Sequence, residues 1–168
     1  MIYKAALVSK NKSPSMSTRT RTEEILHAWR DGSVILQKLW PENKPMRKWA
    51  GLTFALPPHE QILLKINLPE QGLTSVPAAL GEIKTLGYLN LRDNKLESVP
   101  GSLGDISWLT YLDLERNRLT KIPSEMGLLD RLKTLHLAGN PWQFNHSLPE
   151  EWRPEADLRQ NAGCDFRR

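Results

Sequence analysis

The chain contains a sequence pattern that repeats every 23 residues. Residues 86–108 align without gaps with residues 109–131, and Leu, Asn, Pro and Gly recur at matching positions. Because one unit of this length cannot bury its hydrophobic face alone, we expect consecutive units to stack around a continuous core. The register extends upstream to Leu63 and downstream to Asn140. The matched positions of the first copy are Leu86, Leu89, Leu91, Asn94, Leu96, Val99, Pro100, Leu103, Gly104 and Ile106.

Each unit is expected to begin with a short strand, because its L-x-x-L-x-L segment places leucines on one side of an extended chain. The strands should pair in parallel at ~4.8 Å spacing. An amide-bearing residue follows each strand, and we expect it to be buried and to bond the backbone of the turn and of the next coil. In the I/V-P-x-x-L-G-x-L segment on the outer side, Pro fixes the turn and Gly permits a tight return. The strands should centre near residues 64–68, 87–91, 110–114 and 133–137, and the amide column is Gln71, Asn94, Asn117 and Asn140.

The repeated L-x-x-L-x-L-x-x-N-x-L pattern resembles that of leucine-rich repeats. Its 23-residue period is similar to the intracellular group that includes Ras-pathway scaffolds and their plant relatives. The resemblance implies an α/β solenoid, in which about four units spanning residues 62–142 form an arc with a parallel β-sheet on its concave face. A helical N-terminal cap and a short C-terminal cap would close the two ends. The resemblance assigns a fold more than a function, because one fold hosts many functions.

Residues 20–61 are expected to form the N-terminal cap, since the first repeat would otherwise expose its apolar edge. Thr20 and Glu23 have the spacing of a capping box, and a helix over residues 20–40 is expected to break at Gly32. The segment from residue 49 to 53 is similar to the caps of plant-type leucine-rich-repeat proteins, although the paired cysteines usual there are absent. The aromatic residues expected to pack as cap core, rather than to hold a cofactor, are Trp29, Trp40, Trp49 and Phe54.

Residues 143–168 are expected to be a C-terminal cap and tail. Their apolar side chains are spaced so that they can cover the last coil, as terminal repeats require. These side chains are Phe144, Leu148, Trp152, Leu158 and Phe166.

The net charge of +4 is concentrated at the N-terminus. Residues 1–22 carry five basic side chains and no acidic one, whereas the rest of the chain carries 18 basic and 19 acidic side chains. We interpret residues 1–19 as a basic flexible tail or targeting arm, since an acid-free, hydroxyl-rich start resembles an organelle transit peptide. The single cysteine, Cys164, excludes an internal disulfide and favours a reducing compartment. The predicted location is the cytoplasm, with the mitochondrion or plastid as the alternative.

No catalytic arrangement stands out in the sequence. The four histidines, at positions 27, 59, 136 and 146, lack metal-binding spacing, and the glycines form no phosphate-binding loop. Cys164 has no histidine close to it in sequence, which is typical of an unreactive thiol. No apolar run approaches the ~18 residues of a membrane span, and a nearly neutral body argues against binding nucleic acid. We therefore predict that the chain is not an enzyme and has no cofactor, metal site or small-molecule substrate.

The outward positions of the predicted strands form the candidate interaction surface. Tyr88 and Tyr111 fall at the same position of neighbouring strands and are expected to be exposed. An aromatic centre inside a polar rim has the composition of a protein-binding patch. The plainer interpretation is a solvated sheet face, with Arg92 and Glu115 as a cross-strand ion pair. The candidate partner-binding residues are Lys65, Asn67, Tyr88, Asn90, Arg92, Tyr111, Asp113, Glu115 and His136.

These observations predict an intracellular adaptor or signalling scaffold that binds a protein partner through its concave face. The alternative is a structural accessory subunit of a large, possibly organellar, assembly that is anchored by the N-terminal arm. Under either interpretation the chain is a monomer or a subunit of a hetero-complex.

Overall fold

The structure is a computed structural model that describes residues 20–141 and the backbone of residues 165–167. The basic segment 1–19 lies outside the described residues, as do Phe144, Leu148, Trp152 and Leu158 of the predicted C-terminal cap. Within residues 20–141, no helix is both long and apolar enough to cross a membrane.

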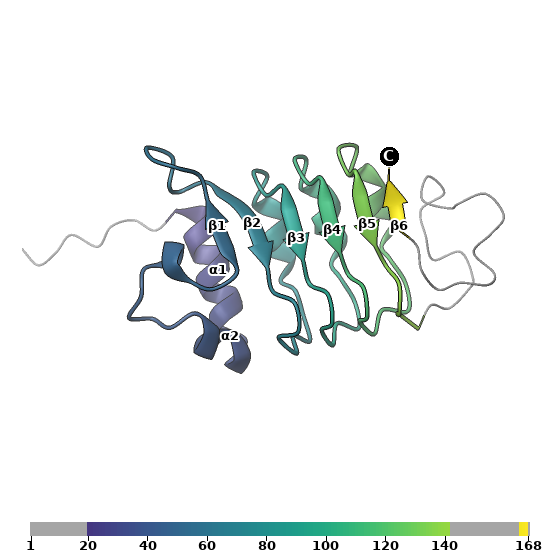
Figure 1. Ribbon diagram of the computed structural model, residues 1–168, viewed down its shortest axis with the longest axis horizontal. Helices are drawn as coiled ribbons and strands as arrows, with labels where there is room; N and C mark the ends of the chain where they lie inside the picture. The colour runs from purple at the N-terminus through teal and green to yellow at the C-terminus, as the bar shows by residue number, and fades with distance from the viewer. Residues whose placement is uncertain (1–19, 142–164, 168) are drawn as a thin grey trace, which may run out of the picture.

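One six-stranded sheet runs through the molecule, and its strands follow each other in chain order (Figure 1). The four central strands, β2 to β5, are parallel, and Lys65, Tyr88, Tyr111 and Thr134 are register partners across them. This register confirms the 23-residue alignment and the predicted solenoid. The strands are β1 (Leu52–Phe54), β2 (Leu63–Asn67), β3 (Tyr88–Asn90), β4 (Tyr111–Asp113), β5 (Thr134–His136) and β6 (Asp165–Arg167).

The two outermost strands run antiparallel to their neighbours, and this edge pairing was not predicted, although residues 49–54 were expected to be extended. Strand β1 pairs with β2, and β6 pairs with β5 with Phe166 opposite Leu135. An exposed strand edge carries unpaired N–H and C=O groups, so an added strand at each end covers the backbone of the repeat sheet.

Short 3-10 helices form the outer side of each coil, behind the strands in Figure 1. Each begins directly after a proline (Pro77, Pro100 or Pro123) whose φ angle lies between −71° and −58°, which is where the pyrrolidine ring holds it. These helices turn one apolar side chain into the core, and Leu80, Leu103 and Met126 are fully buried. They are η2 (Ala78–Glu82), η3 (Gly101–Asp105) and η4 (Ser124–Leu128), with a further turn, η1 (Met46–Lys48), in the cap.

The three asparagines of the amide column are buried and fully bonded, as Asn117 illustrates. Its Nδ2 donates to the carbonyl oxygens of Leu91 at 2.9 Å and Leu114 at 3.1 Å, and its Oδ1 accepts from the N–H of Leu96 at 3.1 Å. Asn94 and Asn140 repeat this geometry. The expectation was wrong in one respect. Each amide bonds its own turn and the preceding coil, not the next one.

Gln71 stands at the head of the column and differs for the same reason. No repeat precedes it, so its Nε2 donates locally to the carbonyl of Pro69 at 2.7 Å, and the side chain is half-buried. Its own N–H donates to Asn94 Oδ1 at 3.1 Å, which ties the first unit to the second.

The N-terminal cap begins with two helices, α1 (Arg21–Asp31) and α2 (Val34–Leu39), which are separated at Gly32 as predicted. The capping box is present, because Glu23 N–H donates to Thr20 Oγ1 at 3.3 Å and Thr20 N–H donates to Glu23 Oε2 at 2.8 Å. Helix α1 also contacts the first repeat through Arg21, whose Nε lies 2.7 Å from Glu82 Oε2. This contact lowers the pKa of Glu82, chiefly through the hydrogen bond from Arg21.

Three tryptophans form the centre of the cap. Trp40 is fully buried, with its ring stacked on Trp49 at 5.2 Å and edge-on to Trp29 at 5.7 Å. Each indole N–H donates to a backbone carbonyl, as buried indoles require: Trp29 to Ser75 and Trp40 to Ala50, for example. Phe54 packs partly buried against the same core. The prediction that these aromatic residues are cap core is confirmed.

Candidate interaction surface

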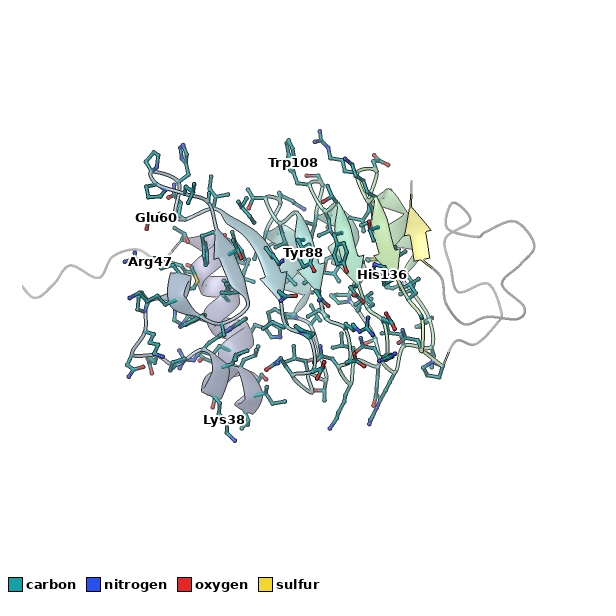
Figure 2. All side chains as sticks on the ribbon, viewed as in Figure 1. Lys38, Arg47, Glu60, Tyr88, Trp108 and His136 are labelled. Atoms are coloured by element: carbon teal, nitrogen blue, oxygen red, sulfur yellow. The ribbon has the colours of Figure 1, made fainter. Side chains whose placement is uncertain are left out.

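Four side chains from four neighbouring strands form a continuous row on the outward face of the sheet, which we call the aromatic ladder (Lys65, Tyr88, Tyr111 and His136). The Tyr88 and Tyr111 rings are stacked with centroids 4.2 Å apart and planes 3° from parallel. The Lys65 ammonium lies 3.9 Å from the Tyr88 centroid, and the His136 ring lies 5.5 Å from that of Tyr111. Figure 2 shows Tyr88 and His136 over the strands of the same sheet face.

The tyrosines are half-buried rather than exposed, which corrects one expectation. Each ring face has a neighbour: Lys65 and Tyr111 cover Tyr88, while Tyr88 and His136 flank Tyr111. Parallel strands lie ~4.8 Å apart, close to the separation of stacked rings, so side chains at one register position cover each other. Both faces of the Tyr88 ring and the face of Tyr111 that is stacked on it are therefore covered.

Asp113 was expected on the surface, but it is buried, with 4% of its area exposed. Its Oδ2 accepts from the Tyr111 hydroxyl at 3.2 Å, and its Oδ1 accepts from the Glu115 N–H at 3.0 Å. Asp113 thus holds the Tyr111 hydroxyl from a position two residues further along the same strand. Burial raises the pKa of the Tyr111 phenol, and the Asp113 carboxylate adds to the increase.

Replacing Tyr111 with Phe is expected to reduce the loss of stability at high pH. The folded protein keeps the Tyr111 phenol neutral above its ordinary pKa of about 10. The contribution of the neutral phenol to the free energy of unfolding is therefore complete below about pH 10. It falls as the pH rises above that value, by at most about 1.4 kcal/mol per pH unit. Urea unfolding of wild type and Tyr111→Phe between neutral and strongly alkaline pH measures the difference. Parallel pH profiles for the two proteins would contradict the assignment.

An amide row lies beside the ladder. Asn90 Nδ2 donates to Asn67 Oδ1 at 2.9 Å, and Asn90 Oδ1 accepts from the Arg92 N–H at 3.0 Å. Asn90 is therefore half-buried and bonded, where the sequence suggested a free surface position. The row continues to Asp113 and His136, which are register partners across β4 and β5.

A closed network of four charged side chains follows the strands. Arg92 bonds Glu115 at 2.9 Å and Asp93 at 2.9 Å, while Arg116 lies 3.4 Å from Glu115 and 3.8 Å from Asp93. The predicted Arg92–Glu115 pair is confirmed. The hydrogen bond that Arg92 donates to Asp93 is the main cause that raises the pKa of Arg92. Two cations and two anions cancel, so this part of the face presents no net charge.

The sequence did not identify two members of this network, Asp93 and Arg116. Both belong to a column of positive-φ residues that recurs every 23 positions with φ between 51° and 69°. Because the residue types in this column differ, the pattern of identities does not reveal it. The column is Glu70, Asp93, Arg116 and Gly139.

The geometry described so far is that of stacked coils with inward leucines, a buried asparagine column and outer prolines. A family model described as leucine rich repeat matches residues 63–119 and again residues 84–142. The chain is a leucine-rich-repeat protein. This family typically provides binding modules. No curated protein matches the chain.

Solved structures with similar folds include two plant receptor ectodomains, both from Arabidopsis thaliana. The leucine-rich-repeat ectodomain of the receptor kinase SOBIR1 is 25% identical with a TM-score of 0.53, covering 64% of this chain and 66% of that one. The ectodomain of the receptor kinase GASSHO1/SCHENGEN3, in complex with CASPARIAN STRIP INTEGRITY FACTOR 2, is 29% identical with a TM-score of 0.53. That match covers 61% of this chain and 12% of the other.

A leucine-rich-repeat protein of Leptospira interrogans is 36% identical over 42% of this chain, with a TM-score of 0.41. The match spans 18% of that protein's chain. The chain thus spans less than two thirds of the length of each of these three structures.

Proposed function

We propose that this leucine-rich-repeat protein is an intracellular, non-enzymatic adaptor that binds a protein partner through the concave face, centred on Tyr88 and Tyr111. The observation that carries the proposal is the aromatic ladder, since two stacked tyrosines lie at the middle of an otherwise polar sheet face. Tyrosine is enriched at interfaces and among the residues that dominate binding energy. The single cysteine, Cys164, supports a reducing compartment such as the cytoplasm.

The neighbouring residues fit this role. Asn67, Asn90, Arg92 and Glu115 are half-buried and already bonded to each other, so their geometry is held before any partner arrives. A pre-organised face loses less conformational entropy on binding than a mobile one. A complex of the GASSHO1/SCHENGEN3 ectodomain, which is 29% identical over 61% of this chain, is consistent with a recognition role for such repeats.

Replacing Tyr88 and Tyr111 together with alanine is expected to abolish capture of the main partner. Truncation of a binding hot spot typically weakens binding by ~2 kcal/mol or more. The partner is identified by affinity purification of the tagged full chain and mass spectrometry, and capture is then compared between variants. Because the rings stack, the double variant also loses about 0.5–1.5 kcal/mol of pair energy, so circular dichroism must show that it stays folded.

Two further variants make this test decisive. Glu97→Ala with Lys121→Ala changes two exposed residues away from the ladder and should leave capture unchanged. Tyr88→Phe with Tyr111→Phe keeps the stack and removes only the hydroxyl groups, so it should retain most of the binding. If the alanine pair captures the partner normally and deletion of residues 1–19 releases it, the structural-subunit interpretation replaces this one.

A further inference from the structure

Two lysines lie near the ends of the register row that contains Tyr88 and Tyr111, and neither is in an ion pair with a described side chain. Lys65 lies on β2, and Lys133 directly precedes β5 and is exposed. Among the residues whose side chains are described, neither forms an ion pair, and the Lys65 ammonium instead contacts the Tyr88 ring. Tyr88 and Tyr111 are on the two strands between the lysines, in register with Lys65 and with Thr134, the residue after Lys133. We call this region the lysine-flanked strip (Lys65, Tyr88, Tyr111 and Lys133).

The acidic groups nearest to the strip along the strands are already engaged. Asp113 is buried and accepts two hydrogen bonds, while Glu115 and Asp93 belong to the neutral network with the two arginines. Glu70 follows β2, at the opposite end of that strand from the strip. The Asp113 carboxylate accepts from neutral donors only and keeps its charge. Two lysines against this one carboxylate leave a net charge of +1 at the strip and beside it.

We propose that the strip binds an acidic, extended segment of the partner protein, with two carboxylates that pair with Lys65 and Lys133. This inference rests on the proposed function and specifies its partner. The two lysines are three strand steps apart, or ~14 Å at ~4.8 Å per step. An extended chain advances ~3.3–3.6 Å per residue, so the carboxylates are about four residues apart.

The residues between the two carboxylates are small or aliphatic. They lie against Tyr88 and Tyr111, and the Tyr88 ring, covered by Lys65 and Tyr111, has no free face on which an aromatic side chain of the partner could stack. Few side chains project next to the tyrosines. Gly87, which precedes Tyr88, has no side chain, and the hydroxyl of Thr110 is held against the backbone because it donates to the Gly87 carbonyl at 2.9 Å. A polypeptide fits this arrangement better than nucleic acid, whose evenly spaced phosphates call for a longer row of cations.

The experiment selects binders from a phage-displayed library of random peptides against the full chain. The selected peptides should carry two Asp or Glu residues about four positions apart, and their affinity should fall as salt is raised. The double variant Lys65→Gln and Lys133→Gln should bind the best of them at least about tenfold more weakly, a loss of ~1.4 kcal/mol. Lys95→Gln with Lys121→Gln removes two exposed charges elsewhere and should leave the affinity nearly unchanged.

The outcomes separate this inference from the proposed function. Peptides that are neutral or basic, yet lose binding to the Tyr88→Ala and Tyr111→Ala variant, overturn the acidic-segment inference and leave the concave face as the binding site. Peptides insensitive to both the tyrosine and the lysine variants overturn both proposals. An empty selection, or displacement of the selected peptides by single-stranded oligonucleotides at equal concentration, also counts against an acidic peptide.

Discussion

Replacing Asn117 with leucine should destabilise the protein by more than about 3 kcal/mol. The side chain is 5% exposed, and its amide satisfies the carbonyl groups of Leu91 and Leu114 and the N–H of Leu96. Leucine has a similar size but no donor or acceptor, so three buried backbone groups lose their partner at once. Each such group left unsatisfied costs ~1–3 kcal/mol. Urea unfolding monitored by circular dichroism measures the change.

The matched control is the same substitution at Asn90, which occupies a strand position on the sheet face. Its amide bonds another side chain, Asn67, and one backbone N–H, and both groups lie where water can replace the lost bond. Asn90→Leu is therefore expected to cost several times less than Asn117→Leu. If both variants lose the same free energy of unfolding, the hydrogen bonds of Asn117 to buried backbone groups are not what makes it important for stability.

Replacing Gly104 with alanine is expected to have the second large effect, a loss of about 1–3 kcal/mol or more. A β-carbon at this position would overlap the carbonyl oxygen of Glu125 and lie 2.6 Å from the carbonyl carbon. Both atoms belong to the backbone of the next coil, so no side-chain rotation can make room. Gly81 meets the backbone of Ser102 in the same way, which identifies the pair as a column of contacts between coils.

Gly87 provides the control for this substitution. A β-carbon there would lie 3.7 Å from the nearest atom, the carbonyl oxygen of Trp108, which is an ordinary contact distance. Gly87→Ala should therefore change the midpoint of thermal unfolding little, whereas Gly104→Ala should lower it by several degrees. Similar midpoints for the two variants would mean that the coils separate easily and that their close approach is not needed for stability.

The register of the sheet was predictable because spacing alone carries it. Matching residues 23 apart places Tyr88 beside Tyr111 and aligns the strand leucines, such as Leu89 and Leu112, which are fully buried. A slip of one residue would turn these leucines to the other face of the sheet. The cap was predictable for a similar reason. The capping-box pair Thr20 and Glu23 and the helix break at Gly32 depend on residues close in sequence.

The solvent exposure of the residues on the candidate surface was predicted less well. The alignment placed Tyr88, Tyr111 and Asp113 at outward positions, but exposure depends on what neighbouring strands place beside each side chain. Stacking at 4.2 Å half-buries the rings, and Asp113 is buried beside them, where it accepts hydrogen bonds from Tyr111 and Glu115. Whether a partner binds these residues stays a prediction.

The sequence by itself determined the repeat, the parallel register, the asparagine column and the tryptophan cap, because each rests on local pattern and fixed spacing. Only the tertiary structure decided which coil each asparagine bonds, why Gly104 must lack a side chain and that antiparallel strands cover both edges of the sheet. These features depend on distances between coils, which are set by the packing of all their side chains together. Asp93 and Arg116 share a positive φ angle but not a residue type, so a comparison of residue identities between repeats does not detect their column.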